Sequence, residues 1–246
     1  MTTVRVPNFN RLSDELHFPN SFHSVFVTLP LFGRVDMAGV DFGLCGGMAY
    51  TVRDIFEAGR IPPPDTSPPN SPSPLLDYLV DRLVDSLGGG MAFKFVELSD
   101  PLLPDHDTLV THGRAWEMIK NQWPKVKADL DGGRLSPIGL IRHKSANPID
   151  ILNNHQVLAW GYDLNGDDLI LHVYDPNDPA EDITLTLNIG RPENTTRITY
   201  TSTHNTAPVF MFFRTEYTFV DPSSISPRRP ATETTSLFML TLMMPG

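Results

Sequence analysis

Apolar residues in the first half of the chain recur at intervals of three and four, the spacing of one helix face. This spacing predicts a helix over residues 44–58 that begins at Cys45. A second helix is expected to begin at Ser73-Pro74, because serine followed by proline is typical of a helix start, and to end before Gly88. A third helical region is expected over residues 114–130, with an interruption at Trp123-Pro124.

The hydrophobic pattern changes in the second half to short runs rich in β-branched and aromatic residues, separated by Gly, Pro, Asn or Asp. These runs predict strands at residues 136–142, 156–162, 169–174, 183–189, 197–200, 209–213 and 237–242. Helices followed by antiparallel strands indicate an α+β fold. Half of residues 61–74 are proline, which predicts an exposed extended loop.

The length of 246 residues is enough for one large domain, and we expect residues 1–246 to form it. Its helical part would cover about residues 40–133 and its sheet-rich part about residues 134–246. The net charge of −10 argues against a nucleic-acid partner. No segment approaches the roughly 20 apolar residues of a membrane span, and no signal peptide is recognised, so we expect a cytoplasmic protein without a membrane partner.

The single cysteine of the chain, Cys45, lies in a glycine-bracketed turn that runs into the first predicted helix. Backbone N–H groups at a helix start stabilise a thiolate and lower the pKa of a cysteine there. His155 begins a later apolar run, and Asp175 closes the run after that. Cysteine, histidine and a carboxylate or amide in this order are typical of thiol-dependent acyl-transfer enzymes. The other histidines and acids show no metal-ligand spacing, so neither a metal nor a cofactor is expected.

A hairpin is predicted at Asn165-Gly166, because Asn-Gly lies there between two apolar runs. The residue opposite His155 would be Asp175, Pro176 or Asn177, depending on the strand register; with Pro176 opposite, a bulge is needed. A histidine base needs an acceptor that holds its second ring N–H. Asp175 is favoured as this orienting residue because it still lies in the strand-like run, whereas Asn177 lies in a proline-bracketed turn.

These motifs resemble the papain-like cysteine peptidase superfamily over residues 41–179, most nearly the bacteriocin-processing peptidases and their relatives. In that group Cys-Gly follows a loop, histidine precedes an apolar strand, and Asp-Pro closes the next strand. The resemblance implies a cysteine-bearing helix packed on an antiparallel sheet. It also implies Cys45 as nucleophile, His155 as general base and acid, and Asp175 as orienter in the hydrolysis of a peptide or small amide.

One departure from that family concerns the oxyanion hole. A glutamine about six residues before the cysteine usually donates a hydrogen bond there, whereas this chain has Gly39, and a nearby ionised Asp41 only accepts. Asn153 and Asn154 are candidate replacement donors. Without a donor, the chain would be a catalytically inactive papain-fold binding module. A related acyltransferase, which passes the acyl group to an amine, is a further alternative.

Overall fold

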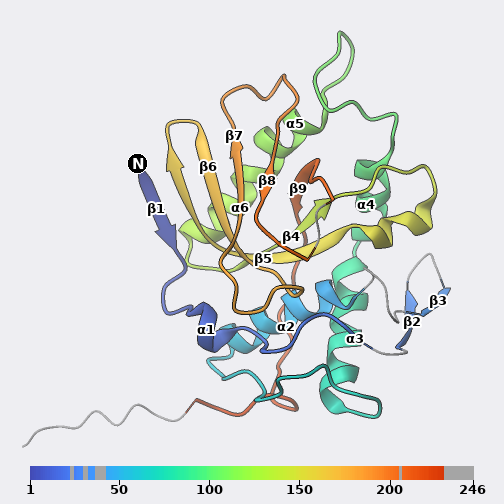
Figure 1. The fold of residues 1–246 in the computed structure, drawn as a ribbon, viewed down its shortest axis with the longest axis vertical. Helices are drawn as coiled ribbons and strands as arrows, with labels where there is room; N and C mark the ends of the chain where they lie inside the picture. Colours follow the sequence, from blue (N-terminus) through green and yellow to red (C-terminus); the bar gives the residue numbers. More distant parts are fainter. Residues whose placement is uncertain (23–24, 30–32, 37–42, 205–206, 230–246) are drawn as a thin grey trace, which may run out of the picture.

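The computed structural model describes residues 1–22, 25–29, 33–36, 43–204 and 207–229. In this part of the chain, helices lie beside an antiparallel sheet whose strands come mostly from the second half of the sequence (Figure 1). The expected α+β class is confirmed. The strand predicted at residues 237–242, as well as Gly39 and Asp41, lie outside the described residues.

The three predicted helical regions are present in the described residues, together with short helices that were not predicted. They are α1 (Arg11–Asp14), α2 (Cys45–Glu57), α3 (Pro74–Leu87), α4 (Met91–Ser99), α5 (Arg114–Trp116) and α6 (Trp123–Asp131), with a π-helical turn η1 (Glu117–Gln122) between α5 and α6, and a 3-10 helix η2 (Pro148–Asn153). The Ser73 hydroxyl caps α3 by accepting from the Leu76 N–H at 3.4 Å. Helix α4 was not expected, because three consecutive glycines precede it; Gly90, with φ of +89°, begins it.

Within the described residues, seven strands form the main sheet. They are β1 (Thr2–Arg5), β4 (Ser136–Ile141), β5 (His155–Asn165), β6 (Asp168–Tyr174), β7 (Ile183–Asn188), β8 (Thr199–Tyr200) and β9 (Met211–Arg214), in the order β8-β7-β6-β5-β4-β9, with β1 paired to β5. Strands β2 (Phe26–Leu29) and β3 (Gly33–Asp36) form a separate hairpin. Strands β4 to β9 lie where the sequence predicts them, whereas β1, β2 and β3 were not predicted.

The predicted hairpin joins β5 and β6, but its turn lies one residue later than Asn165-Gly166. Asn165 pairs with Asp168, so Gly166 and Asp167 form a two-residue turn. Gly166 has a φ of +60°, a conformation that glycine adopts without the strain of a side chain. This tight turn fixes which residues of the two strands face each other.

A bulge at Trp160 then shifts the register of the same hairpin by one residue. Beyond it, Leu158 pairs with Tyr174. Continued past the strand end, this register would place His155 opposite Asn177, which is one of the three alternatives that the sequence left open. The bulge thus determines which residues after β6 can reach the start of β5.

Helix α2 packs closely against α3 and β5 because its first turn is made of small residues. A Cβ atom on Gly46 would lie 2.3 Å from both the Gln156 Nε2 and the Ser86 Oγ atoms. A Cβ atom on Gly47 would lie 2.1 Å from the Leu79 carbonyl oxygen. The start of the helix that carries Cys45 is therefore held at short range by two neighbouring elements.

The segment after β9 returns across α2 and α3, where a buried ion pair holds it (Figure 1). The Arg82 guanidinium lies 2.7 Å from the Asp54 carboxylate, and both side chains are almost fully buried. Asp54 also accepts hydrogen bonds from the Tyr217 hydroxyl at 2.6 Å and the Val220 N–H at 3.0 Å. This network joins two helices to the returning chain.

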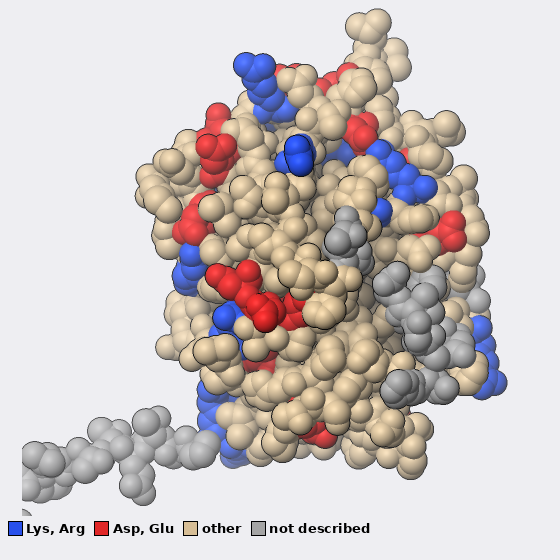
Figure 2. All heavy atoms as spheres, viewed as in Figure 1, with Lys and Arg blue, Asp and Glu red and all other residues tan. Residues whose placement is uncertain are grey.

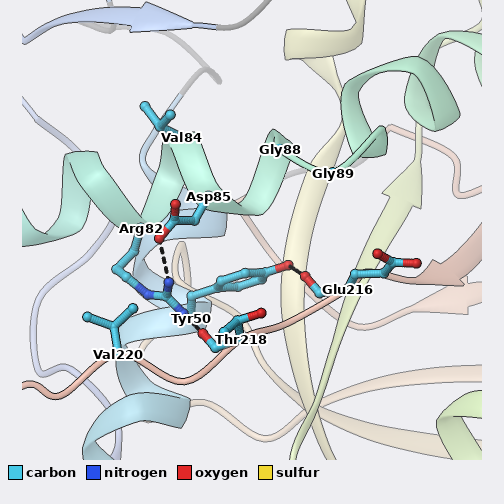
Figure 3. A pocket seen from close by; sticks show the side chains of 9 residues that line it. All are labelled: Tyr50, Arg82, Val84, Asp85, Gly88, Gly89, Glu216, Thr218 and Val220. Carbon is cyan, nitrogen blue, oxygen red and sulfur yellow. Dashed lines mark hydrogen bonds and ion pairs between the residues drawn. The ribbon is translucent and has the colours of Figure 1, made fainter.

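Charged side chains of both signs are interspersed over the face shown in Figure 2. A pocket of about 480 Å³ lies between the end of α3 and the segment after β9 (Figure 3). At its wall, Arg82 donates to the Thr218 carbonyl at 2.8 Å and to the Asp85 carboxylate at 2.6 Å. The Arg82 guanidinium is thus already bound by protein groups.

No helix of the described residues is long and apolar enough to cross a membrane.

Candidate active site

Cys45 is the first residue of α2 and is 7% exposed. The Met48 N–H donates to the Leu44 carbonyl at 2.8 Å and begins the helical ladder. Leu44 offers no side-chain acceptor to the N–H groups of this first turn. A helix start without a side-chain cap favours a negative charge nearby, because its N–H groups and its dipole point toward that charge. The Cys45 sulfur therefore lies at a helix start that favours negative charge on a bound group.

His155 and Asp175 form the buried polar contact that the sequence predicts. His155 begins β5, Asp175 follows β6, and the His155 Nε2 and Asp175 Oδ1 atoms are 2.6 Å apart. Asp175 also accepts hydrogen bonds from the Asn177 N–H at 2.9 Å and from the Tyr200 hydroxyl. The carboxylate of Asp175, rather than the amide of Asn177, is thus the group that the imidazole contacts.

The charges of this cluster reinforce one another. Burial alone would lower the pKa of His155, but the negative charges of Asp175 and Cys45, together with hydrogen bonds to both, raise it to about 10. Burial alone would raise the pKa of Asp175, but the charge of His155 and the hydrogen bonds to the carboxylate hold it below its usual value. At neutral pH the arrangement favours an imidazolium between Asp175 and Cys45.

Asn20 also lies at this site, although the sequence analysis did not identify it. Its Nδ2 atom donates to the Asn177 Oδ1 atom at 3.0 Å, and its backbone N–H donates to the Pro176 carbonyl at 2.9 Å. A Cβ atom on Gly43 would lie 1.8 Å from this same Nδ2 atom. The Asn20 amide therefore occupies the space that a side chain would fill two residues before Cys45. Gly43 was the available sequence signal, but its spacing does not point to Asn20.

Asn154, one of the two expected oxyanion donors, joins strand ends. Its Nδ2 atom donates to the Ser99 Oγ atom at 2.9 Å, while its Oδ1 atom accepts from the Arg142 N–H at 2.8 Å and the His143 N–H at 2.9 Å. These contacts tie the end of β4 to the start of β5. Asn153, the other candidate, is half-buried at the end of η2, and its role as a donor stays a prediction.

Two further titratable groups are buried close to the cluster. Tyr174 and Glu15 are each 1% exposed, and neither the Tyr174 hydroxyl nor the Glu15 Oε1 atom has a hydrogen-bond partner in the described part of the chain. Burial raises the pKa of Glu15 to about 8, and the charge of Asp175 contributes to the rise. Burial, with the charges of Glu15, Asp175 and Cys45, also raises the pKa of Tyr174. The site is thus bordered by groups that favour their neutral forms.

In the described residues, His155 contacts Asp175 at 2.6 Å and lies close enough to Cys45 for the two groups to interact. A thiol, a base that contacts it and an acceptor that orients the base are the parts that nucleophilic acyl transfer requires. Within the same described residues, no group of three or more His, Cys, Asp or Glu side chains is arranged to hold a metal ion. Comparisons of the chain with protein-family models, with curated proteins and with solved structures found no match.

Proposed function

We propose that the chain is a papain-like thiol hydrolase that cleaves a peptide or a related amide through an acyl-enzyme on Cys45. This proposal rests on the position of His155 between Asp175 and Cys45. The His155 Nε2 atom is 2.6 Å from Asp175, which leaves the Nδ1 atom for the Cys45 thiol. Cys45 also lies at the start of α2, where uncapped backbone N–H groups favour negative charge.

The reaction begins with attack of the Cys45 sulfur on the carbonyl carbon, which forms a C–S bond. The His155 imidazolium then gives its proton to the leaving nitrogen as the C–N bond breaks. In the second half, His155 takes a proton from water, whose oxygen attacks the thioester. The C–S bond then breaks, so the carboxylic acid is released and the thiolate is restored. Asp175 keeps the imidazole oriented throughout.

The test measures alkylation of Cys45 by iodoacetamide across a range of pH, followed by intact mass. The reaction is expected to be faster at neutral pH than that of a free thiol and slower in His155→Ala. His172→Ala is the matched control, because His172 also pairs with a carboxylate, Asp163, at 2.7 Å, but away from Cys45. The wild-type rate is expected in this control.

Incubation with an activated ester such as p-nitrophenyl acetate then separates hydrolase from binding module. A hydrolase accumulates an acyl-enzyme at Cys45 and releases the acid, whereas added amine captures the acyl group in an acyltransferase. Ordinary thiol titration that is unchanged in His155→Ala, together with no acyl-enzyme, would overturn the proposal and favour the binding module.

A further inference from the structure

Acyl transfer at Cys45 needs hydrogen-bond donors for the negative charge that develops on the substrate carbonyl oxygen. The Cys45 backbone N–H, at the start of α2, is one such donor. Both ends of the Asn154 amide are engaged in joining the end of β4 to the start of β5, and the residue at position 39 is a glycine, which has no side-chain donor. Among the described residues, another side-chain amide at this turn is therefore a candidate for the second donor.

Asn20 is the amide that the fold delivers to this turn. Ideal Cβ geometry at Gly43 places that atom 1.8 Å from the Asn20 Nδ2 atom and 1.9 Å from its Oδ1 atom, so the amide lies directly on the Gly43 backbone. The Oδ1 atom is buried and has no hydrogen-bond partner among the described residues. The backbone of Asn20 is fixed by its 2.9 Å hydrogen bond to the Pro176 carbonyl. The amide is thus held at the junction where Cys45 begins its helix.

Asn177 links this amide to the histidine and its carboxylate. The Asn177 side chain accepts one hydrogen of the Asn20 amide at 3.0 Å, and the Asn177 N–H donates to Asp175 at 2.9 Å. An asparagine amide carries two hydrogens, so the second hydrogen of Asn20 is left for another acceptor. The contact with Asn177 restricts rotation of the amide.

We infer that Asn20 is the side-chain oxyanion donor of this site and that Asn177 positions it. The inference rests on the proposed function and identifies the residue that replaces the family's glutamine. Asn20 would donate its second amide hydrogen to the substrate oxygen while the Cys45 sulfur attacks. Asn177 would act through Asn20, because its side-chain oxygen accepts from the Asn20 amide at 3.0 Å.

The experiment compares two reactions of the same thiol in the full chain. Acylation by p-nitrophenyl acetate develops an oxyanion, whereas alkylation by iodoacetamide does not. In Asn20→Ala, acylation is expected to fall by about 10²–10³-fold, while alkylation stays at the wild-type rate. Unchanged alkylation shows at the same time that the variant folds and retains its thiol and His155.

Asn177→Ala should lower acylation less than Asn20→Ala does. Acylation of the double variant, Asn20→Ala with Asn177→Ala, should be no slower than that of Asn20→Ala alone. The effects of two substitutions do not add when one residue acts through the other. Asn70→Ala, in the exposed proline-rich loop, is the control that keeps the wild-type rate.

Wild-type acylation in Asn20→Ala would overturn the inference, as would a loss that appears in Asn153→Ala instead. A parallel loss of alkylation in Asn20→Ala would also overturn it, because the residue would then act on the thiol or on the fold. If the wild-type protein forms no acyl-enzyme, the proposed function fails first, and the inference with it.

Discussion

At the scale of single residues, Asp175 has the densest set of contacts in the site. It is 1% exposed and accepts from His155, from the Tyr200 hydroxyl and from the Asn177 N–H. A buried carboxylate is stable in its charged form only when such donors surround it. The position of the imidazole therefore depends on every donor that holds this one carboxylate in place.

Asp175→Asn is expected to lower the rate of acylation at Cys45 by about 10²–10⁴-fold, because the neutral amide neither supports the imidazolium nor fixes its tautomer. The measurement is the single-turnover rate with p-nitrophenyl acetate. Asp163→Asn, which alters the separate pair with His172, serves as the matched control. Equal rates in the two variants would contradict the role of Asp175.

Glu15 predicts a pH dependence of stability. Its folded pKa is about 8 against an ordinary value of 4.5, so the folded chain keeps a proton that the unfolded chain releases between these values. The contribution of Glu15 to the free energy of unfolding should therefore be largest below pH 4.5, fall as pH rises, and level off above pH 8. The full effect of this one group is at most about 5 kcal/mol.

Urea unfolding of Glu15→Gln against the wild type measures this effect across the same range. The difference in unfolding free energy should move in favour of Glu15→Gln as pH rises, because the amide does not ionise. Glu181→Gln, which replaces an exposed carboxylate, should keep the wild-type dependence. A difference that stays constant with pH would show that Glu15 is already ionised in the fold.

At the scale of elements, the parts that local pattern determines were predictable. The helix start at Cys45, the strand start at His155 and the tight turn at Gly166 each follow from their own neighbours in sequence. The bulge at Trp160 and the arrival of Asn20 beside the site do not, because they depend on contacts between distant segments. Strand β1 is a similar case, since four residues are too short to show a pattern and pair only because β5 is present.

Gly46→Ala tests the close packing of the first turn of α2. The added methyl would lie 2.3 Å from Gln156 and Ser86, so side chains or helix must shift, at a cost of about 1–3 kcal/mol. The midpoint of thermal unfolding (Tm) and the alkylation rate of Cys45 should both fall. The double variant Gly46→Ala with Gln156→Ala lacks one of the two clashing groups. It should therefore regain part of the Tm and part of the alkylation rate. An unchanged Tm and alkylation rate in Gly46→Ala would mean that the first turn of α2 has space for a methyl group.

At the scale of the whole molecule, the two ends of α2 take part in different contacts. Its start carries Cys45, while Asp54, near its end, holds α3 through Arg82 and the returning chain through Tyr217. Burial raises the pKa of Asp54 even though Arg82 and Tyr217 oppose the rise. The ion pair therefore does not fully offset the cost of burying its charges, and its main effect is to specify how three segments meet.

Single and double variants of the Asp54–Arg82 ion pair are expected to differ in stability. Asp54→Leu leaves the buried Arg82 with only the more exposed Asp85 as a charge partner, so the free energy of unfolding should fall by up to about 3–5 kcal/mol. Asp54→Leu combined with Arg82→Met should cost less than the single change, because no buried charge is then unpaired. Lys127→Met, which breaks an exposed pair with Asp131, should cost no more than about 1 kcal/mol. Urea unfolding measures all three, and a double variant that loses the sum of the two single losses would show that the charges stabilise the fold outright.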